Sequence, residues 1–156
     1  MNPKPSSENQ YLIEHAKLLI NSFHQLLGYP LVSSNVDETK LGWELFHSKF
    51  ALLSHTNAKE PIFNYSNQTA LDLFELSWEE LMTLPSRLSA EPLNQIERAR
   101  LLEQVTEHGY INNYEGVRIS KTGKRFVIHN AIVWNLLDAN GNYQGQAACF
   151  SDWEFI

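Results

Sequence analysis

The chain has 156 residues, of which 43% are hydrophobic and 19% are charged, so its composition is that of one globular domain and not of a disordered segment. Its net charge of −6 argues against nucleic acid as a partner, because binding to phosphates needs a positive surface. The single cysteine, Cys149, excludes an intramolecular disulfide; the first ten residues lack the apolar core of a secretory signal, and no apolar run reaches bilayer length. We therefore expect a cytoplasmic protein without a membrane partner.

A long amphipathic helix is predicted near the N-terminus. Apolar side chains recur there at the spacing of one helical face, namely Leu12, Ala16, Leu19, Ile20, Phe23 and Leu27. Gly28 and Pro30 end the pattern, because glycine is favoured just after a helix and proline cannot continue one. We expect residues 1–7 to be disordered, residues 8–35 to form this helix and a linker, and residues 36–156 to form the main domain.

Several short elements follow the linker. Residues 50–54 and 61–65 are predicted to be strands joined by a turn. Asn67 is a residue type that caps helices, and Ser77 with Glu80 has the spacing of a capping box. A longer helix is predicted to run from about residue 95 to residue 108. The residues expected on its apolar face are Ile96, Ala99, Leu102 and Val105.

The last third of the chain is predicted to be strands. Three runs, 110–119, 125–137 and 143–153, are separated by segments that contain Gly123 and Gly141, which is typical of hairpin turns. Strands that are grouped apart from helices favour an α+β fold with an antiparallel sheet.

Two parts of the sequence resemble the PAS domain family. Residues 50–81 resemble the opening hairpin and first helices of that family, and residues 115–153 resemble its C-terminal hairpins. The matching positions in the second part are Glu115, Arg118, Gly123, Asp138, Gly141 and Asp152. The MEKHLA-type PAS-like domain is a closer match, through residues 86–92, 116–120, 122–126, 133–136 and 145–148. This resemblance covers residues 41–153.

The resemblance implies a PAS-like fold, in which a five-stranded antiparallel sheet carries short helices on one face, here preceded by the N-terminal amphipathic helix. It implies a sensory or interaction module, because PAS domains enclose a small ligand between helices and sheet and often dimerise. The sequence shows no recognisable DNA-binding or kinase segment, so we expect the protein to act alone, to signal through a regulatory protein partner, or simply to bind a molecule.

The resemblance to flavin-binding PAS domains around residues 85–88 leaves the cofactor open. Ser86 stands where the light-sensing subclass has its reactive cysteine, while the phosphate-binding arginine is kept as Arg87. The positions that read the flavin ring fall on Arg118, Ile128 and Phe150, of which the last two cannot hydrogen-bond. Both losses argue against flavin.

The histidines give little support to a haem or metal site. Haem would need an axial ligand, and His108 lies roughly where haem-binding relatives hold theirs, although a cation before Gly109 also suits an ordinary helix end. The histidine spacings predict no metal site.

Strand alternation predicts the composition of a pocket. Phe126, Ile128, Asn130, Ile132 and Trp134 share one face of their strand, which we expect to point inward. The full set of residues expected to bind a ligand is Phe63, Tyr65, Phe74, Trp78, Ser86, Arg87, Leu88, Tyr114, Arg118, Ile128, Asn130, Gln146 and Phe150.

This set suits a small molecule with an anionic or carbonyl group beside an apolar body. The alternative is that Arg118 pairs with Glu115 or Glu91 and that side chains fill the interior. We expect no catalysis, because the inward positions contain no Asp, Glu or His, although Ser86 and His108 could meet through the fold.

A homodimer is predicted from apolar residues on the other face of the sheet. Val127, Ala131 and Val133 take the outward positions of their strand, so a second layer must cover them. We expect the N-terminal helix to supply that layer, with Leu12, Leu19 and Phe23 at or near the dimer interface. The alternative is that this helix closes only its own core. A ligand-free dimerisation module is the second function that these patterns allow.

Overall fold

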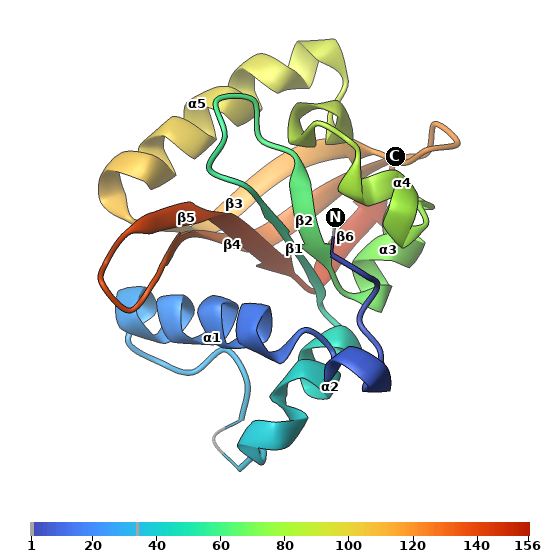
Figure 1. Cartoon of the computed structure of the whole chain (residues 1–156). Coiled ribbons are helices and arrows are strands. Elements are labelled where there is room, and N and C mark those ends of the chain that lie inside the picture. Colours follow the sequence, from blue (N-terminus) through green and yellow to red (C-terminus); the bar gives the residue numbers. More distant parts are fainter. Residues whose placement is uncertain (1, 34) are drawn as a thin grey trace.

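A computed structural model describes residues 2–33 and 35–156, and it shows one antiparallel sheet of six strands (Figure 1). The strands are β1 (Ala51–His55), β2 (Phe63–Ser66), β3 (Tyr110–Ile119), β4 (Arg125–Leu137), β5 (Tyr143–Phe150) and β6 (Asp152–Phe155). Their order is β2-β1-β5-β4-β3, and β6 pairs with the first half of β4. The predicted α+β class with an antiparallel sheet is confirmed, and the last predicted strand is divided into β5 and β6 at Ser151.

Helices cover both faces of this sheet. The α-helices are α1 (Ile13–Leu27), α2 (Leu41–Phe46), α3 (Gln68–Phe74), α4 (Trp78–Met82) and α5 (Pro92–His108), and the 3-10 helices are η1 (Ser7–Asn9), η2 (Glu38–Lys40) and η3 (Ser86–Ser89). Figure 1 shows α5 on one side of the sheet, against β3 and β4, and α1 on the other side, against β4. In the described residues, none of these helices combines the length and the apolar character needed to cross a membrane.

The helix α1 packs on the sheet of its own chain. Leu19 and Phe23 are almost fully buried there, and the Phe23 ring meets the edge of the Trp134 ring at a centroid distance of 4.9 Å. The Ser22 hydroxyl donates to the carbonyl of Leu137 and accepts from its N–H, at 3.1 and 2.8 Å. The structure therefore places Leu19 and Phe23, two residues predicted near a dimer interface, in the core of the single chain.

A bulge in the middle of β4 reverses which side chains face α5. Tyr114 of β3 pairs with Ala131, and Gly116 pairs with Ile128, so β4 has two intervening residues where β3 has one. Asn130 lies at this point with a φ of 53°, in the left-handed region. The extra residue shifts the alternation by one position and moves every later side chain to the other face.

Because of the bulge, several side chains of β4 lie on the opposite face from the one that strict alternation predicts. Ile128 faces α5 as expected, but Val133, predicted to point outward, also lies on the α5 side. Trp134, predicted to point inward, packs against Phe23 of α1. Asn130, predicted as a polar point inside the pocket, is exposed near Phe23. The prediction was wrong from Asn130 onward, because nothing in the sequence marks the inserted residue.

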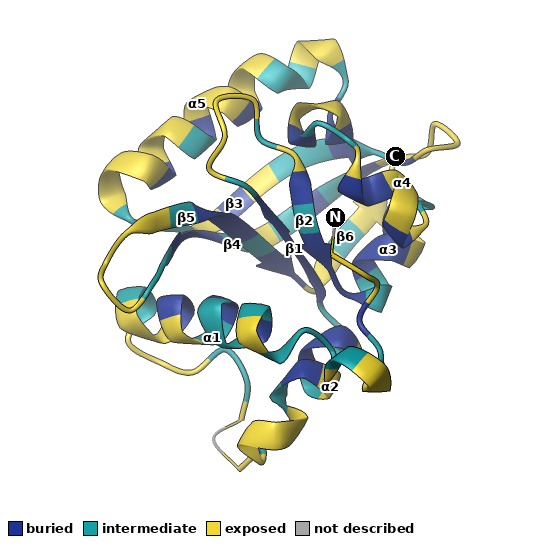
Figure 2. Ribbon diagram, in the orientation of Figure 1, coloured by how far each residue is buried: buried dark blue, intermediate teal, exposed yellow. Residues whose placement is uncertain are grey.

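The buried face of α5 also differs from the prediction. Arg98, Leu101 and Val105 are its buried residues, whereas Ile96 is 70% exposed and Ala99 is exposed. Figure 2 shows the outer face of this helix as largely exposed. The helix thus buries an arginine and exposes an isoleucine, which is the reverse of the usual preference.

The N-terminal segment, expected to be disordered, lies against the domain. Pro5 is buried, and the indole N–H of Trp78 donates to the carbonyl of Asn2 at 2.8 Å. These contacts extend the folded domain to the segment that precedes η1.

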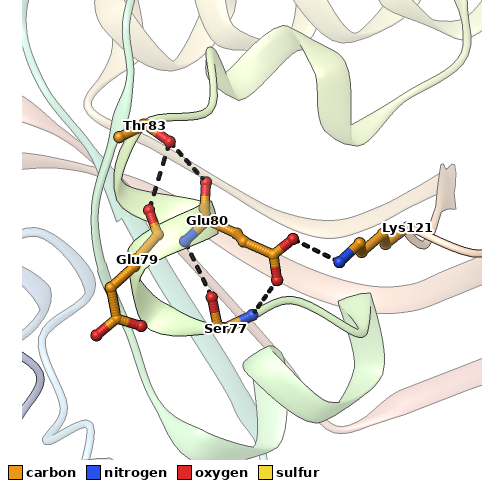
Figure 3. Close-up of polar contacts among 5 residues, drawn as sticks. All are labelled: Ser77, Glu79, Glu80, Thr83 and Lys121. Carbon is orange, nitrogen blue, oxygen red and sulfur yellow. Dashed lines mark hydrogen bonds and ion pairs between the residues drawn. The ribbon is translucent and has the colours of Figure 1, made fainter.

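The predicted capping box attaches α4 to the turn between β3 and β4. The Ser77 hydroxyl accepts from the N–H of Glu80, and the Glu80 carboxylate accepts from the N–H of Ser77, both at 3.1 Å. The same carboxylate accepts from the Nζ of Lys121 in that turn, as Figure 3 shows. An exposed ion pair contributes little energy, so its main effect is to fix where α4 lies.

Candidate functional site

A cavity of about 60 Å³ lies between α5 and the sheet. Its walls come from β1, β2, α3, η3, α5, β3, β4 and β5, and most of them are apolar side chains such as Leu53, Leu101 and Val133. None of the residues that line it, within the part of the chain described, is an aspartate or a glutamate. The cavity occupies the place between helices and sheet where the sequence predicts a pocket.

The structure brings together about half of the residues predicted to bind a ligand. Those that line the cavity are Phe63, Phe74, Tyr114, Arg118, Ile128, Gln146 and Phe150. They come from β2, α3, β3, β4 and β5, which are far apart in sequence, so the fold brings together residues that strand alternation and the resemblance to the PAS family predict separately.

The other predicted residues lie elsewhere. Tyr65 is on the α1 side, where its ring stacks on His15 at a centroid distance of 5.3 Å, and Trp78 packs edge-on against it. Arg87 is exposed and paired with Glu60 at 2.8 Å.

The remaining three do not line the cavity either. Leu88 is exposed, Ser86 is buried with its N–H bonded to the carbonyl of Pro61, and Asn130 lies at the bulge on the other side of the sheet. The segment that carries the flavin resemblance therefore stands outside the cavity.

Arg98 is the main site residue that sequence analysis missed. Its side chain is 8% exposed and lines the cavity from α5. Desolvation lowers the pKa of Arg98 to about 10, and the nearby positive charge of Arg118 acts in the same direction, so the guanidinium stays charged at neutral pH. No carboxylate or carbonyl in residues 2–33 and 35–156 pairs with it. The spacing from Arg98 to Leu101 and Val105 marks one helical face, but a charged residue is not expected on a buried face, so the apolar pattern pointed to Ile96 instead.

Arg118 enters the same cavity from β3. Its guanidinium donates to the carbonyl of Val117 at 2.8 Å and to the hydroxyl of Tyr114 at 3.1 Å. The Tyr114 hydroxyl in turn donates to the carboxylate of Glu97 at 2.9 Å. Gly116 leaves room for this network, since a Cβ there would lie 2.3 Å from the Tyr114 oxygen. The Glu97 carboxylate is therefore linked to Arg118 through the hydroxyl of Tyr114 and not by a direct ion pair.

The acids that were alternative partners of Arg118 are engaged elsewhere. Glu115 lies 2.9 Å from the imidazole of His129, and Glu91 lies 2.6 Å from the guanidinium of Arg125. Neither carboxylate compensates the cavity arginines.

A histidine also lines the cavity, contrary to prediction. His55 is 6% exposed, and its Nδ1 lies 2.9 Å from the carbonyl of Thr56, so Nδ1 carries the proton. Burial lowers the pKa of His55 to about 4, which keeps the ring neutral at pH 7. No hydroxyl or thiol of the described chain is joined to His55 by a hydrogen bond, so the cavity shows no activated nucleophile.

Two amides tie the C-terminal half of α5 to the sheet. The Nε2 of Gln146 donates to the carbonyl of Leu102, to the hydroxyl of Thr106 and to the Oδ1 of Asn135, each at 3.1 Å. The Nδ2 of Asn135 donates to the carbonyl of Val105 at 3.0 Å. Because Gln146 is also a wall of the cavity, it links the cavity directly to α5.

The residues present do not fit flavin. The cavity of about 60 Å³ is less than half the size of the roughly 150 Å³ space that holds a single benzene ring, whereas flavin has three fused rings. Ile128 and Phe150 form its wall at the ring-reading positions, and Arg87 is paired with Glu60. His108, the residue considered for haem, is exposed outside the cavity. Among the described residues, no cluster of three metal-ligating side chains occurs.

Solved structures with a similar fold are PAS and light-oxygen-voltage domains. A PAS domain from Colwellia psychrerythraea is 15% identical and superposes with a TM-score of 0.61, over 73% of this chain and 92% of that domain. The fungal blue-light photoreceptor Vivid, solved as its light-state dimer, is 17% identical with a TM-score of 0.57 over 95% of both chains. These similarities establish a PAS-like fold.

Sequence relatives include plant homeobox-leucine zipper proteins. Homeobox-leucine zipper protein HOX10 of Oryza sativa subsp. indica is 29% identical over 143 residues, and ATHB-15 of Arabidopsis thaliana is 21% identical over 142 residues. Each match covers 90% of this chain, but the chain spans only 17% of the length of either relative. The model of the MEKHLA domain matches residues 13–155, which is nearly the whole chain. The chain therefore belongs to the MEKHLA domain family, the family that the sequence motifs indicate.

Proposed function

We propose that this PAS-like domain binds a small organic molecule in the cavity under α5. The domain then signals, through contacts with other proteins, whether the cavity is occupied. The observation that carries the proposal is an apolar cavity into which a buried guanidinium, that of Arg118, presents donors that its two partners do not use. An apolar wall with a few polar points is typical of a ligand site. The ligand class is a molecule with an anionic or carbonyl group beside an apolar body.

The link between cavity and helix supports a sensory role. A ligand against Gln146 would touch the side chain that holds α5 at Leu102 and Thr106. Ligand binding would thereby bias the position of α5, whose outer face is exposed. We also propose that the domain is not an enzyme, because no hydroxyl, thiol or carboxylate of the described chain is hydrogen-bonded to His55.

Native mass spectrometry of freshly purified protein, with an absorption spectrum of the same sample, tests this function. We expect an extra mass that is lost on denaturation, without visible absorption. Ala148→Leu fills the cavity from β5 and should abolish the extra mass, while Ala99→Leu, on the exposed face of α5, should keep it. If no molecule is retained and a thermal-shift panel of small organic compounds gives no response, the domain is not a ligand sensor.

A homodimerisation module is the second candidate, and exposed apolar side chains favour it. Leu93 and Ile96 on α5 are 86% and 70% exposed, which is unusual for a helix that covers a sheet. The light-state dimer of Vivid supports contacts between copies in a protein of similar fold. The cytoplasmic location stays a prediction, based on the single free thiol of Cys149.

A further inference from the structure

We propose that Arg98 and Arg118 together bind the carboxylate of a short monocarboxylic acid, whose apolar tail occupies the cavity between α5 and the sheet. This inference rests on the proposed ligand-binding function and narrows it to one chemical class. It also assigns a ligand contact to α5, which carries none of the residues that the sequence predicts for the site.

The first step is the uncompensated charge of Arg98. Moving a charged group out of water is unfavourable unless a counter-charge or hydrogen bonds replace the lost hydration. Arg98 is 8% exposed, and in the described chain no carboxylate and no hydrogen-bond acceptor pairs with its guanidinium, which has only the nearby Tyr114 as a favourable neighbour. The apolar side chains of Leu93 and Ile96 would suit the buried face of α5 better, yet they point to solvent. A local conflict of this kind is expected at a functional site.

The second step is the balance of charge in the cavity. Arg98 and Arg118 contribute two positive charges, and the Glu97 carboxylate compensates one of them through the Tyr114 hydroxyl. One positive charge is left over, which matches a single carboxylate. Guanidinium groups bind carboxylates through paired N–H donors, and Arg118 keeps donors that its own partners do not use.

The third step is the size and polarity of the remaining space. A volume of about 60 Å³ is far below that of a typical drug-sized pocket, so the ligand has about two to four carbons. The walls around the two arginines are apolar, with Leu53, Phe63 and Ile128 among them. An anion without a tail, such as inorganic phosphate, would leave this apolar part empty, and a long fatty acid would not fit.

Titration of the ¹⁵N-labelled full chain, followed by nuclear magnetic resonance, tests the proposal with four probes. Sodium propionate has the expected charge and length, and 1-propanol has the same length without the charge. Sodium phosphate has charge without a tail, and sodium hexanoate has a tail that exceeds the cavity. We expect saturable shifts with propionate, including the Nε–H signal of Arg98, and at least about tenfold weaker binding of the other three.

Variants test whether propionate binding depends on Arg98 itself or on any positive charge of α5. Arg98→Gln should weaken propionate binding by about tenfold or more, and Arg98→Lys should restore part of it because the charge is kept. Arg100→Gln is the matched control, since Arg100 is exposed on the same helix, and it should change the Kd less than about twofold. Arg98 makes no bond within the described chain, so its replacement should leave the fold intact, which amide spectra would verify.

The outcomes distinguish this inference from the function on which it rests. Equal binding of propionate and 1-propanol, or unchanged affinity in Arg98→Gln, would overturn the carboxylate site. Preferential binding of phosphate or hexanoate would overturn it as well. A retained molecule without a carboxylate, detected by native mass spectrometry, would do the same while the sensory role stands. If that experiment retains nothing and no compound responds, both proposals fail together.

Discussion

At the scale of single residues, Arg98 occupies a position on α5 that helical periodicity assigns to an apolar side chain. Helical periodicity predicts which positions of α5 face the sheet, and hydrophobicity predicts which residue types are usual at such positions. At Arg98 these two criteria disagree. Leu102 and Val105 satisfy both criteria, and the prediction that they lie on the sheet-facing side holds. The cavity therefore contains a charge that side-chain statistics alone would place in solvent.

Two other residues make stability depend on pH. His15 on the α1 side and His55 in the cavity are both largely buried, and burial lowers the pKa of each to about 4. The ordinary histidine value is near 6.5, so below that pH the unfolded chain binds protons that the folded chain does not. The contribution of these two neutral histidines to stability is therefore fully present above pH 7, and it is lost as the pH falls towards 4. We expect a loss of about 1–2 kcal/mol per histidine between pH 8 and pH 5.5.

Urea unfolding at pH 8 and pH 5.5 measures this loss. His15→Gln should remove about half of the difference, because one of the two protonation sites is gone. His24→Gln, on the exposed face of the same helix, should leave the difference in place. An undiminished loss in His15→Gln would show that His15 is not a source of the pH dependence.

At the scale of elements, Asn67, the residue that caps α3, fixes the position of β1 relative to α2 and α3. The side chain of Asn67 is fully buried, and its Oδ1 accepts from the N–H groups of Leu52 and Ala70 at 3.0 and 3.1 Å. Its Nδ2 donates to the carbonyls of Leu45 and Phe50 at 3.1 and 2.8 Å. One amide thus joins α2, the start of β1 and the N-terminus of α3.

Asn67→Ala should cost about 3 kcal/mol or more, because it leaves four buried backbone groups short of a partner. Asn67→Asp should not rescue the fold, since a carboxylate cannot donate to Leu45 and Phe50. Gln68→Ala is the control: its amide bonds to Asp72 at the surface, and we expect a change of less than about 0.5 kcal/mol. Thermal and chemical unfolding give these values, and an equal cost of both alanine variants would contradict the prediction.

The elements and the family could be predicted from the sequence because their signals are local. The capping residues Asn67 and Ser77 fold as predicted, and the hairpin glycines Gly123 and Gly141 lie at positive φ. The bulge at Asn130 could not be predicted, since pairing with β3 decides it and the strand itself carries no marker. Seven of the seventeen residues that line the cavity could be predicted from strand alternation and the resemblance, while Arg98 needed the tertiary structure.

At the scale of the whole molecule, the two faces of the sheet serve different purposes. The α1 side is closed by contacts within one chain, including the ring contact between Phe23 and Trp134. The α5 side encloses the cavity and exposes apolar residues on its outer surface. If two copies associate, the structure favours the outer face of α5 as the contact and argues against the buried face of α1.

Phe23→Ala and Ile96→Glu separate these two roles. Phe23→Ala should lower the free energy of unfolding by about 3–5 kcal/mol without changing the mass in solution, because it opens a void in the core of each chain. Ile96→Glu should lower the mass of any dimer while stability stays within about 0.5 kcal/mol. Light scattering and urea unfolding check both, with Asn21→Ala on the exposed face of α1 as control. A monomer produced by Phe23→Ala at unchanged stability would mean that α1 packs across copies.

The bulge in β4 has a consequence for how the chain tolerates changes in its length. Loss of the one extra residue at Asn130 would send Val133 towards α1 and Trp134 into the cavity, so both layers would have to repack at once. An added or deleted residue in the exposed turn around Gly141 reverses no side chain in the sheet. Within this domain, insertions and deletions should therefore accumulate between β4 and β5, while the number of residues from Arg125 to Leu137 stays fixed.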